Sequence, residues 1–249
     1  MALLELKNVS KFFGGVQAVN DVSFSIEPEE IVGLIGPNGA GKTTIMNLIT
    51  GLYPLSQGQI VFNGKIISGL KPHSIAHLGI ARTFQIVKPF MGMTVKENVM
   101  MGALFRASRF NLNKNQIQNI VKNALDLVGL GEKADHPVEE LNLAQRRVLE
   151  IARAIAMEPK LLLLDEAMAG LTPTEVQRLL DLVRTLNAQG MTVLLIEHVL
   201  KVVMNLSRRV LVLHYGRLIA EGSPQEIVNN PKVIEAYLGS KREGRIQGG

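Results

Sequence analysis

The sequence GPNGAGKTT, at residues 36–44, has the residue types of a loop that binds a polyphosphate. It fits the pattern G-x-x-x-x-G-K-[ST], whose glycines let the backbone turn its N–H groups towards phosphate oxygens. In this pattern the lysine, Lys42, reaches the β and γ phosphates, and the hydroxyl of Thr43 binds Mg²⁺. The candidate binding residues are Gly36, Pro37, Asn38, Gly39, Ala40, Gly41, Lys42, Thr43 and Thr44.

The residues on either side of this loop decide whether the motif is significant, because the bare pattern also occurs by chance in simple turns. The apolar run at 31–35 predicts a buried strand before the loop, and Ile45, Leu48 and Ile49 follow with helical spacing. A strand before and a helix after are the context that the motif requires. The helix that opens near Gly41 adds the positive end of its dipole. We therefore expect this loop to hold the phosphates of a nucleotide.

Two acids, Asp165 and Glu166, follow the four consecutive leucines at 161–164. Such a run predicts a strand buried on both faces of a parallel sheet, and ligands of open α/β sheets bind at the carboxyl ends of strands. One carboxylate could then hold Mg²⁺ together with Thr43, while the next orients the water that attacks a γ-phosphate. The alternative is that both acids only cap the next helix. The phosphate-binding loop upstream favours the catalytic interpretation.

Gln85 and His198 also follow predicted strands. His198 could bond to a γ-phosphate oxygen or to the attacking water, and Glu197 beside it is an alternative. The amide of Gln85 could sense the metal or the water, although a glutamine at a strand end means little by itself. Phe13 precedes two glycines, where a turn could present its ring, but the sequence alone favours a core phenylalanine.

The elements that position these residues alternate between strands and helices. Strands are predicted at 3–9, 22–26, 31–35, 58–62, 81–84, 161–164, 192–196 and 210–213, and helices at 71–78, at 144–157 and after capping boxes that start at Thr172 and Ser223. This alternation predicts an open, mostly parallel α/β sheet. From residue 87 to about 140 the pattern becomes mainly helical.

Composition narrows the class of protein. With 249 residues, 47% of them hydrophobic, the chain can bury a large core. Aromatic residues make up 4% and Trp is absent, which argues against base stacking even though the net charge is +5. The absence of Cys excludes disulfides and thiol chemistry. No apolar stretch reaches the ~18 residues that a membrane span needs, so we expect a soluble chain whose membrane role runs through partners.

Together, GPNGAGKTT, Phe84-Gln85, LLLLDEA and LIEH, in this order and at these separations, resemble the ATP-binding subunit of ABC transporters over essentially the whole chain. The segments GIARTFQ (79–85), LEIARAI (149–155) and NNPKVIEAYLG (229–239) look most like the ATPase subunits of branched-chain amino acid importers. Related ATPases for lipopolysaccharide export or for urea remain alternatives. So do a soluble ABC ATPase that acts on nucleic acid or ribosomes, and an ATP sensor that does not hydrolyse.

The resemblance implies a P-loop NTPase fold of the RecA-like type. It has a mostly parallel core sheet, an N-terminal antiparallel β subdomain and a helical insert subdomain. Residues 1–249 would form one nucleotide-binding domain. Within it, 1–86 and 158–249 would form the ATP-binding core with the β subdomain, and 87–157 the helical subdomain.

The resemblance also implies ATP and Mg²⁺ as ligands, and a role for each site residue. These roles are adenine stacking for Phe13, phosphate binding for 36–44, Mg²⁺ binding for Asp165, general base catalysis for Glu166, metal contact for Gln85 and the part of a switch histidine for His198. The partners implied are membrane permease subunits, whose coupling helix the insert would receive, and a second ATPase subunit in a head-to-tail pair. A solute-binding protein would act indirectly and no nucleic acid is expected. The chain would lie at the cytoplasmic face of the membrane.

The signature segment departs from the family pattern. It usually reads Leu-Ser-Gly-Gly-Gln, whereas residues 141–145 read LNLAQ. Ala144 adds a Cβ where the second glycine is commonly kept, so a partner's nucleotide would be gripped poorly. Ala167 replaces the usual proline after Glu166. We therefore expect a pair of different ATPase subunits, with one competent and one weakened ATP site.

Overall fold

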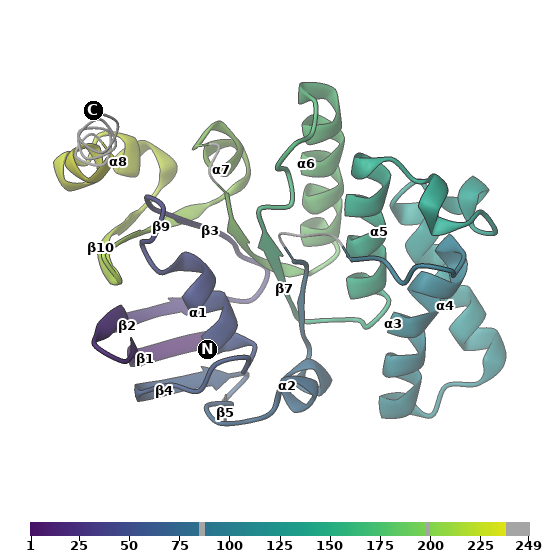
Figure 1. The fold of residues 1–249 in the computed structure, drawn as a ribbon, viewed down its shortest axis with the longest axis horizontal. Helices are drawn as coiled ribbons and strands as arrows, with labels where there is room; N and C mark the ends of the chain where they lie inside the picture. Colours follow the sequence, from purple (N-terminus) through teal and green to yellow (C-terminus); the bar gives the residue numbers. More distant parts are fainter. Residues whose placement is uncertain (85–87, 198–199, 238–249) are drawn as a thin grey trace. The chain divides into compact units, whose positions relative to one another are not determined.

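The computed structural model describes residues 1–84, 88–197 and 200–237, and it divides into two compact units (Figure 1). The first unit consists of Met1–Ile75 and Thr192–Gly249, and the second of Ala76–Met191. The predicted division into an ATP-binding core and a helical subdomain at residues 87–157 stays a prediction.

An antiparallel sheet in the first unit contains the strands nearest the N-terminus. Its strand order is β2-β1-β4-β5, with bounds Val16–Ile26, Leu4–Phe13, Gln57–Phe62 and Lys65–Ile66. Burial alternates over Leu4–Leu6 of β1 and over the paired half of β2 from Val22 to Ile26, which fits a sheet with one covered face. Asn63 and Gly64 join β4 to β5 with φ values of 48° and 75°, as a two-residue hairpin turn requires.

A second, mostly parallel group of strands in the first unit has the order β10-β9-β3-β8. The bounds are Arg217–Gly222, Arg209–His214, Ile31–Ile35 and Thr192–Ile196. Strands β8 and β9 run parallel to β3, and β10 is antiparallel to β9. Every residue of β3 and β8 is buried, and all of them except Thr192 are apolar. Helices α1 (Lys42–Ile49), α7 (Leu200–Leu206) and α8 (Pro224–Val228) belong to the same unit. β10 and α7 are not among the predicted elements.

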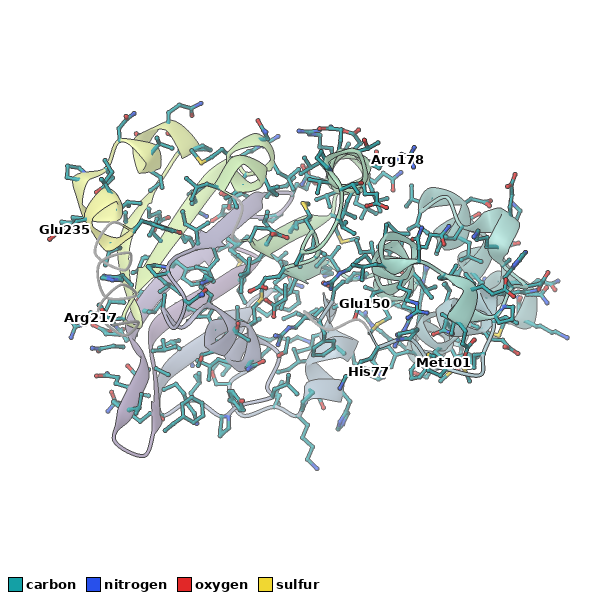
Figure 2. The ribbon with its side chains drawn as sticks, turned by 45° about the horizontal axis from the view of Figure 1, so that its top comes forward. His77, Met101, Glu150, Arg178, Arg217 and Glu235 are labelled. Carbon is teal, nitrogen blue, oxygen red and sulfur yellow. The ribbon has the colours of Figure 1, made fainter. Side chains whose placement is uncertain are left out.

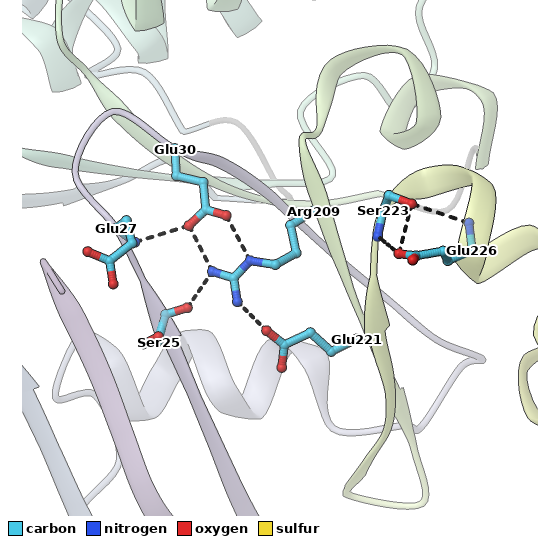
Figure 3. Close-up of polar contacts among 7 residues, drawn as sticks. All are labelled: Ser25, Glu27, Glu30, Arg209, Glu221, Ser223 and Glu226. Carbon is cyan, nitrogen blue, oxygen red and sulfur yellow. Dashed lines mark hydrogen bonds and ion pairs between the residues drawn. The ribbon is translucent and has the colours of Figure 1, made fainter.

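The guanidinium of Arg209, on β9, ties three segments of the first unit together (Figure 3). It donates to both carboxylate oxygens of Glu30 at 2.7 and 2.8 Å, to the carbonyl of Ser25 at 2.7 Å, and to Glu221 on β10. Burial opposes ionisation of Glu30, but the bonds from Arg209 and from the Glu27 N–H outweigh it and lower the pKa of Glu30. The cluster therefore fixes the turn that leads into β3.

The second unit contains a pair of parallel strands and a group of packed helices. β6 (Ile80–Arg82) pairs in parallel with β7 (Leu161–Asp165). Helices α3 (Val95–Phe110), α4 (Lys114–Leu127) and α5 (Leu143–Ile155) contact one another around a shared apolar core. A Cβ on Gly102 of α3 would lie 2.2 Å from the carbonyl oxygen of Arg153 on α5, so glycine permits the close approach of these helices. The mainly helical pattern predicted from residue 87 to about 140 thus corresponds to α3 and α4.

Two capping boxes start helices at the predicted residues. The Thr172 side chain accepts from the Glu175 N–H at the start of α6 (Pro173–Ala188). Ser223 does the same with Glu226 at the start of α8 (Figure 3). α2 (Pro72–Leu78) also matches its predicted range to within one residue. Among the described residues, no helix is both long and apolar enough to cross a membrane.

Candidate functional site

The phosphate-binding loop lies in the first unit, between β3 and α1, and its backbone can be built only with glycine at two positions. Gly36 has φ of 152°, and a Cβ there would lie 2.1 Å from the carbonyl oxygen of Leu213. Gly41 has φ of 103°, and its Cβ would lie 2.6 Å from the carbonyl oxygen of Ala18. A side chain at either position would clash with the backbone of β9 or β2. The shape of the loop therefore depends on glycine at these two positions of the motif.

Lys42 folds back over this loop. Its side chain is buried, and its Nζ donates to the carbonyl oxygens of Gly36 at 2.8 Å and Pro37 at 3.0 Å. Thr43, the next residue, is exposed, and α1 begins at Lys42. A positive charge and a helix N-terminus therefore meet at one loop, which is a geometry that attracts polyanions.

Tyr237 contacts the same loop from the far end of the sequence. The Gly36 N–H donates a hydrogen bond to the Tyr237 hydroxyl oxygen, and burial raises the pKa of this phenol. Sequence reasoning did not single out Tyr237 as a site residue, and a lone tyrosine near the chain end carries no local signal that could reveal this contact.

Phe13 is exposed, so the expectation of a core phenylalanine is wrong. Its ring, at the end of β1, is 42% exposed and meets the ring of Tyr53 edge-on at 5.2 Å between centroids. The Nζ of Lys11 lies 4.9 Å from the Phe13 centroid and also donates to the Pro54 carbonyl at 2.9 Å. The ring is thus steadied by its neighbours, and adenine stacking on it stays a prediction.

The two acids lie in the second unit, at the carboxyl end of β7. Asp165 is 2% exposed, and its Oδ2 accepts from Nη2 of Arg82 at 2.7 Å. Its backbone N–H donates to Oγ1 of Thr83 at 3.4 Å. Its Oδ1 is buried and has no hydrogen-bond partner within the described parts of the chain. One carboxylate oxygen is therefore held, and the other is left able to bind a further group.

Glu166 follows in an uncommon backbone conformation. Its φ is 50°, in the left-handed region, and its side chain is buried at 9% exposure. Such a conformation in a residue with a side chain costs free energy and often marks a functional site. The alternative that the acids cap the next helix is wrong, because Thr172 is the N-cap of α6.

A divalent cation fits Asp165. Its buried Oδ1 is the kind of hard oxygen ligand that Mg²⁺ prefers. Within the described residues, no group of three His, Cys, Asp or Glu side chains could hold an ion alone. Mg²⁺ usually takes one or two carboxylates and completes its shell with phosphate and water.

The signature segment 141–145 forms the start of α5. Asn142 is the N-cap: its Oδ1 accepts from the Gln145 N–H at 2.9 Å, and its own N–H donates to Oε1 of Gln145 at 3.1 Å. Leu141 is buried, whereas Leu143 is 47% exposed. Asn142 and Gln145 thus cap the N-terminus of α5 even though the usual serine and glycines are absent.

The structure brings some of the predicted site residues together within each unit. Lys42 bonds to Gly36 and Pro37 in the first unit, and Asp165 bonds to Arg82 in the second. Gln85 and His198 lie outside the described residues. The convergence of the phosphate loop and the acids on one nucleotide stays a prediction.

A groove of about 290 Å³ opens on the second unit. Its lining combines apolar and charged side chains: Arg82, Phe84, Phe90, Met101, Gly102, Phe105, Glu150, Arg153, Ala154 and Met157. Met101 comes from α3 and Glu150 from α5 (Figure 2). Burial raises the pKa of Glu150 and lowers that of Arg153, whose guanidinium lies 4.3 Å from the Phe90 ring centroid. Sequence reasoning did not identify this groove, because its lining is spread over distant segments.

Comparisons with known proteins give one consistent result. Residues 19–169 match the family described as ABC transporter, and residues 217–243 match the family described as branched-chain amino acid ATP-binding cassette transporter. The high-affinity branched-chain amino acid transport ATP-binding protein BraF of Pseudomonas aeruginosa is 40% identical, covering 95% of this chain and 98% of that protein. LivG of Escherichia coli, which carries the same description, matches with the same identity and coverage.

Among solved structures, this chain is also similar to ATP-binding cassettes of ABC transporters. The ADP conformation of MJ1267, an ATP-binding cassette of an ABC transporter, superposes with a TM-score of 0.87 at 33% sequence identity. The match covers 96% of this chain and 99% of that one. The likeness thus extends over nearly the full length of both chains, and it confirms the predicted P-loop NTPase fold.

Proposed function

We infer the role of this chain from one established premise: the chain belongs to the ABC transporter family. It is an ATP-binding ATPase subunit of that family, homologous to the ATP-binding proteins of branched-chain amino acid importers. The finer assignments, which are the residue roles, the metal, the partners and the solute, are our proposals.

We assign the phosphates of ATP to the loop at 36–44 and the adenine to Phe13. The support is the glycine-dependent path of the loop, the helix N-terminus at Lys42 and the exposed, steadied ring of Phe13. In the complex, Lys42 would exchange its two carbonyl partners for phosphate oxygens. A charge-assisted bond to phosphate is stronger than one to a neutral carbonyl, which favours the exchange.

We assign Mg²⁺ to Asp165 and Thr43, with Gln85 as a further contact. The free Oδ1 of Asp165 and the exposed hydroxyl of Thr43 support this. The ion would neutralise the negative charge that develops on the phosphates during hydrolysis. In our proposal Arg82 keeps the Asp165 carboxylate fixed, and the backbone N–H groups of the phosphate loop hold the phosphate oxygens.

We assign the general base to Glu166. Its carboxylate would accept a proton from the water that attacks the γ-phosphate, and the left-handed backbone would fix its direction. His198 would hold a γ-phosphate oxygen or the same water. Removal of the base should therefore slow hydrolysis and leave nucleotide binding intact.

We propose that the groove on the second unit docks a helix of a membrane permease subunit, which places the chain at the cytoplasmic face of the membrane. Exposed apolar side chains such as Phe84, Phe90 and Met101 would bury a helix's apolar face. Arg153 and Glu150 would bond to its polar groups. A solute-binding protein would act only through the permease.

We propose that the chain pairs head-to-tail with a different ATPase subunit. The signature segment keeps its helix cap through Asn142 but exposes Leu143 where the family pattern has glycine. A leucine side chain there would obstruct the partner's nucleotide. The resulting pair would have one competent and one weakened ATP site.

The solute we propose is a branched-chain amino acid. The observation that carries this is the homology over 95% of the chain, together with the separate match of residues 217–243 to the branched-chain amino acid group. A decisive experiment purifies the chain with its copurifying membrane subunits, reconstitutes the complex in liposomes, and measures ATP-dependent uptake of radiolabelled leucine, urea and an inert sugar. Leucine uptake that depends on ATP is the expected result.

The control is Glu166→Gln in the same complex. It should bind ATP like the unmodified chain and lose both turnover and uptake. Uptake of urea in preference to leucine would overturn the solute assignment, and turnover unaffected by Glu166→Gln would overturn the assignment of the base. If no membrane subunit copurified and the chain bound nucleic acid, the transport role itself would be wrong.

A further inference from the structure

Consecutive residues at the end of β6 connect Asp165 to the groove within the second unit. Arg82 donates from Nη2 to Oδ2 of Asp165 at 2.7 Å, and Thr83 accepts at Oγ1 from the Asp165 N–H at 3.4 Å. The Thr83 N–H also continues the pairing with β7 by donating to the Leu163 carbonyl at 3.0 Å. Both the side chain and the backbone of Asp165 are therefore held by this short segment.

The next residue, Phe84, belongs to the groove. Its ring is 48% exposed and lines the groove. Helix α5 holds its main chain from both sides, because the Phe84 N–H donates to Oε1 of Glu150 at 3.3 Å and its carbonyl accepts from Nη1 of Arg147 at 3.2 Å. The backbone of Phe84 is therefore held in place, while its ring stays exposed to a ligand that enters the groove.

The guanidinium of Arg82 lies between these two features. Its carbon Cζ is 5.1 Å from the centroid of the Phe84 ring, within the range of a cation–π contact, while its Nη2 holds Asp165. The side chains of Arg82 and Asp165 are 6% and 2% exposed, so water screens their interaction little. A guanidinium is planar and rigid. A contact that rotates its plane therefore also changes the direction of the N–H donors at its edge.

We propose that Arg82 is a positioning residue that transmits the occupancy of the groove to the carboxylate of Asp165. An occupant that moves the Phe84 ring would rotate the Arg82 plane, and with it the carboxylate whose Oδ1 is left for the metal. The inference rests on the proposed function, since it takes Asp165 as a magnesium ligand. Coupling between two sites is reciprocal. A cation bound at Asp165 must therefore change the surroundings of the Phe84 ring.

The experiment places a single 4-fluorophenylalanine at position 84 of the full-length chain, saturates the protein with ADP, and titrates Mg²⁺ while recording the ¹⁹F spectrum. The resonance should shift and saturate with Mg²⁺. In Arg82→Met the shift should fall at least threefold, while a fluorescent ADP analogue still binds. A purely structural Arg82 would not alter the response of position 84 to the metal.

Phe110 provides a matched control position. It lies in the same unit, its ring is 48% exposed like that of Phe84, and the Cζ of Arg109 lies 4.6 Å from its centroid. A 4-fluorophenylalanine at position 110 should not respond to Mg²⁺. An equal shift of the ¹⁹F resonance at position 110 would mean that Mg²⁺ changes the whole second unit, and it would overturn the inference.

The remaining outcomes are equally decisive. A shift at position 84 that persists in Arg82→Met would mean that the signal travels through the backbone and would refute the role of Arg82. If Arg82→Met does not fold, Arg82→Lys keeps the charge without the planar group and should at least halve the response. Failure of the unmodified chain to bind ADP would refute the proposed function, whereas ADP and Mg²⁺ binding with a silent position 84 would refute this inference alone.

Discussion

Asn142 and Gln145 hydrogen-bond to each other's backbone N–H groups across the first turn of α5, at 2.9 and 3.1 Å. These residues occupy the first polar position and the last position of the signature segment. The reciprocal bonds satisfy two N–H groups that a helix N-terminus otherwise leaves open. The segment has thus departed from the family pattern at its glycines while keeping the helix end closed.

Replacement of Asn142 by alanine should destabilise the chain by about 1 kcal/mol, because the N-cap is lost. Asn142→Ser, which restores a good cap, should stay within about 0.5 kcal/mol of the unmodified chain. Urea unfolding followed by circular dichroism measures both. Equal stability of Asn142→Ala and the unmodified chain would contradict the cap.

The exposed Leu143 and its neighbour Ala144 should limit ATP turnover. With Leu143→Gly and Ala144→Gly together, we expect a higher rate per site in the assembled complex, since the backbone could then approach the partner's phosphates. A phosphate-release assay measures this, and the chain alone should turn over slowly. Fast, cooperative hydrolysis by the chain alone, unchanged by the two glycines, would refute the proposal of a weakened site.

Lys42→Met should weaken nucleotide binding by at least tenfold, because a charge-assisted bond to phosphate contributes about 1.5–3 kcal/mol. Equilibrium titration with a fluorescent ADP analogue provides the measurement. Lys7→Met is the matched control, since Lys7 is 53% exposed on β1 and paired only with a surface glutamate among the contacts observed for it. Similar losses in both variants would indicate a general effect of charge.

Gly102→Ala should destabilise the second unit by about 1–3 kcal/mol, because the added Cβ would lie 2.2 Å from the Arg153 carbonyl oxygen and force α3 away from α5. Gly15→Ala is the control: no heavy atom lies within 4 Å of the Cβ position there, among the described residues. Thermal unfolding should separate the two variants clearly. A Gly102→Ala chain as stable as Gly15→Ala would mean that the helices tolerate a wider spacing.

Stability should depend on pH through Glu30. Its pKa is lowered in the folded chain below its ordinary value of 4.5, so the folded state holds fewer protons than the unfolded state near that pH. The stabilisation is therefore present above about pH 4.5 and disappears as the pH falls through the folded-state pKa. Glu30→Gln should cost about 1.5–3 kcal/mol at pH 7. Urea midpoints measured from pH 7 to pH 3 should converge for the two chains, and a constant gap would contradict the ion cluster.

The amino-acid sequence by itself determined the phosphate-binding loop, most strands and the capping boxes of α6 and α8. These features depend on residues close together in the chain, such as the apolar run at 31–35 before Gly36, or Thr172 with Glu175. Local backbone geometry and local burial fix them, so a pattern of a few residues is enough.

Tertiary structure alone decided which distant residues meet. Arg82 reaches Asp165 across 83 positions of sequence, and Tyr237 reaches Gly36 from near the end of the chain. No local pattern encodes these contacts, because each results from the packing of strands and helices that are far apart in the sequence.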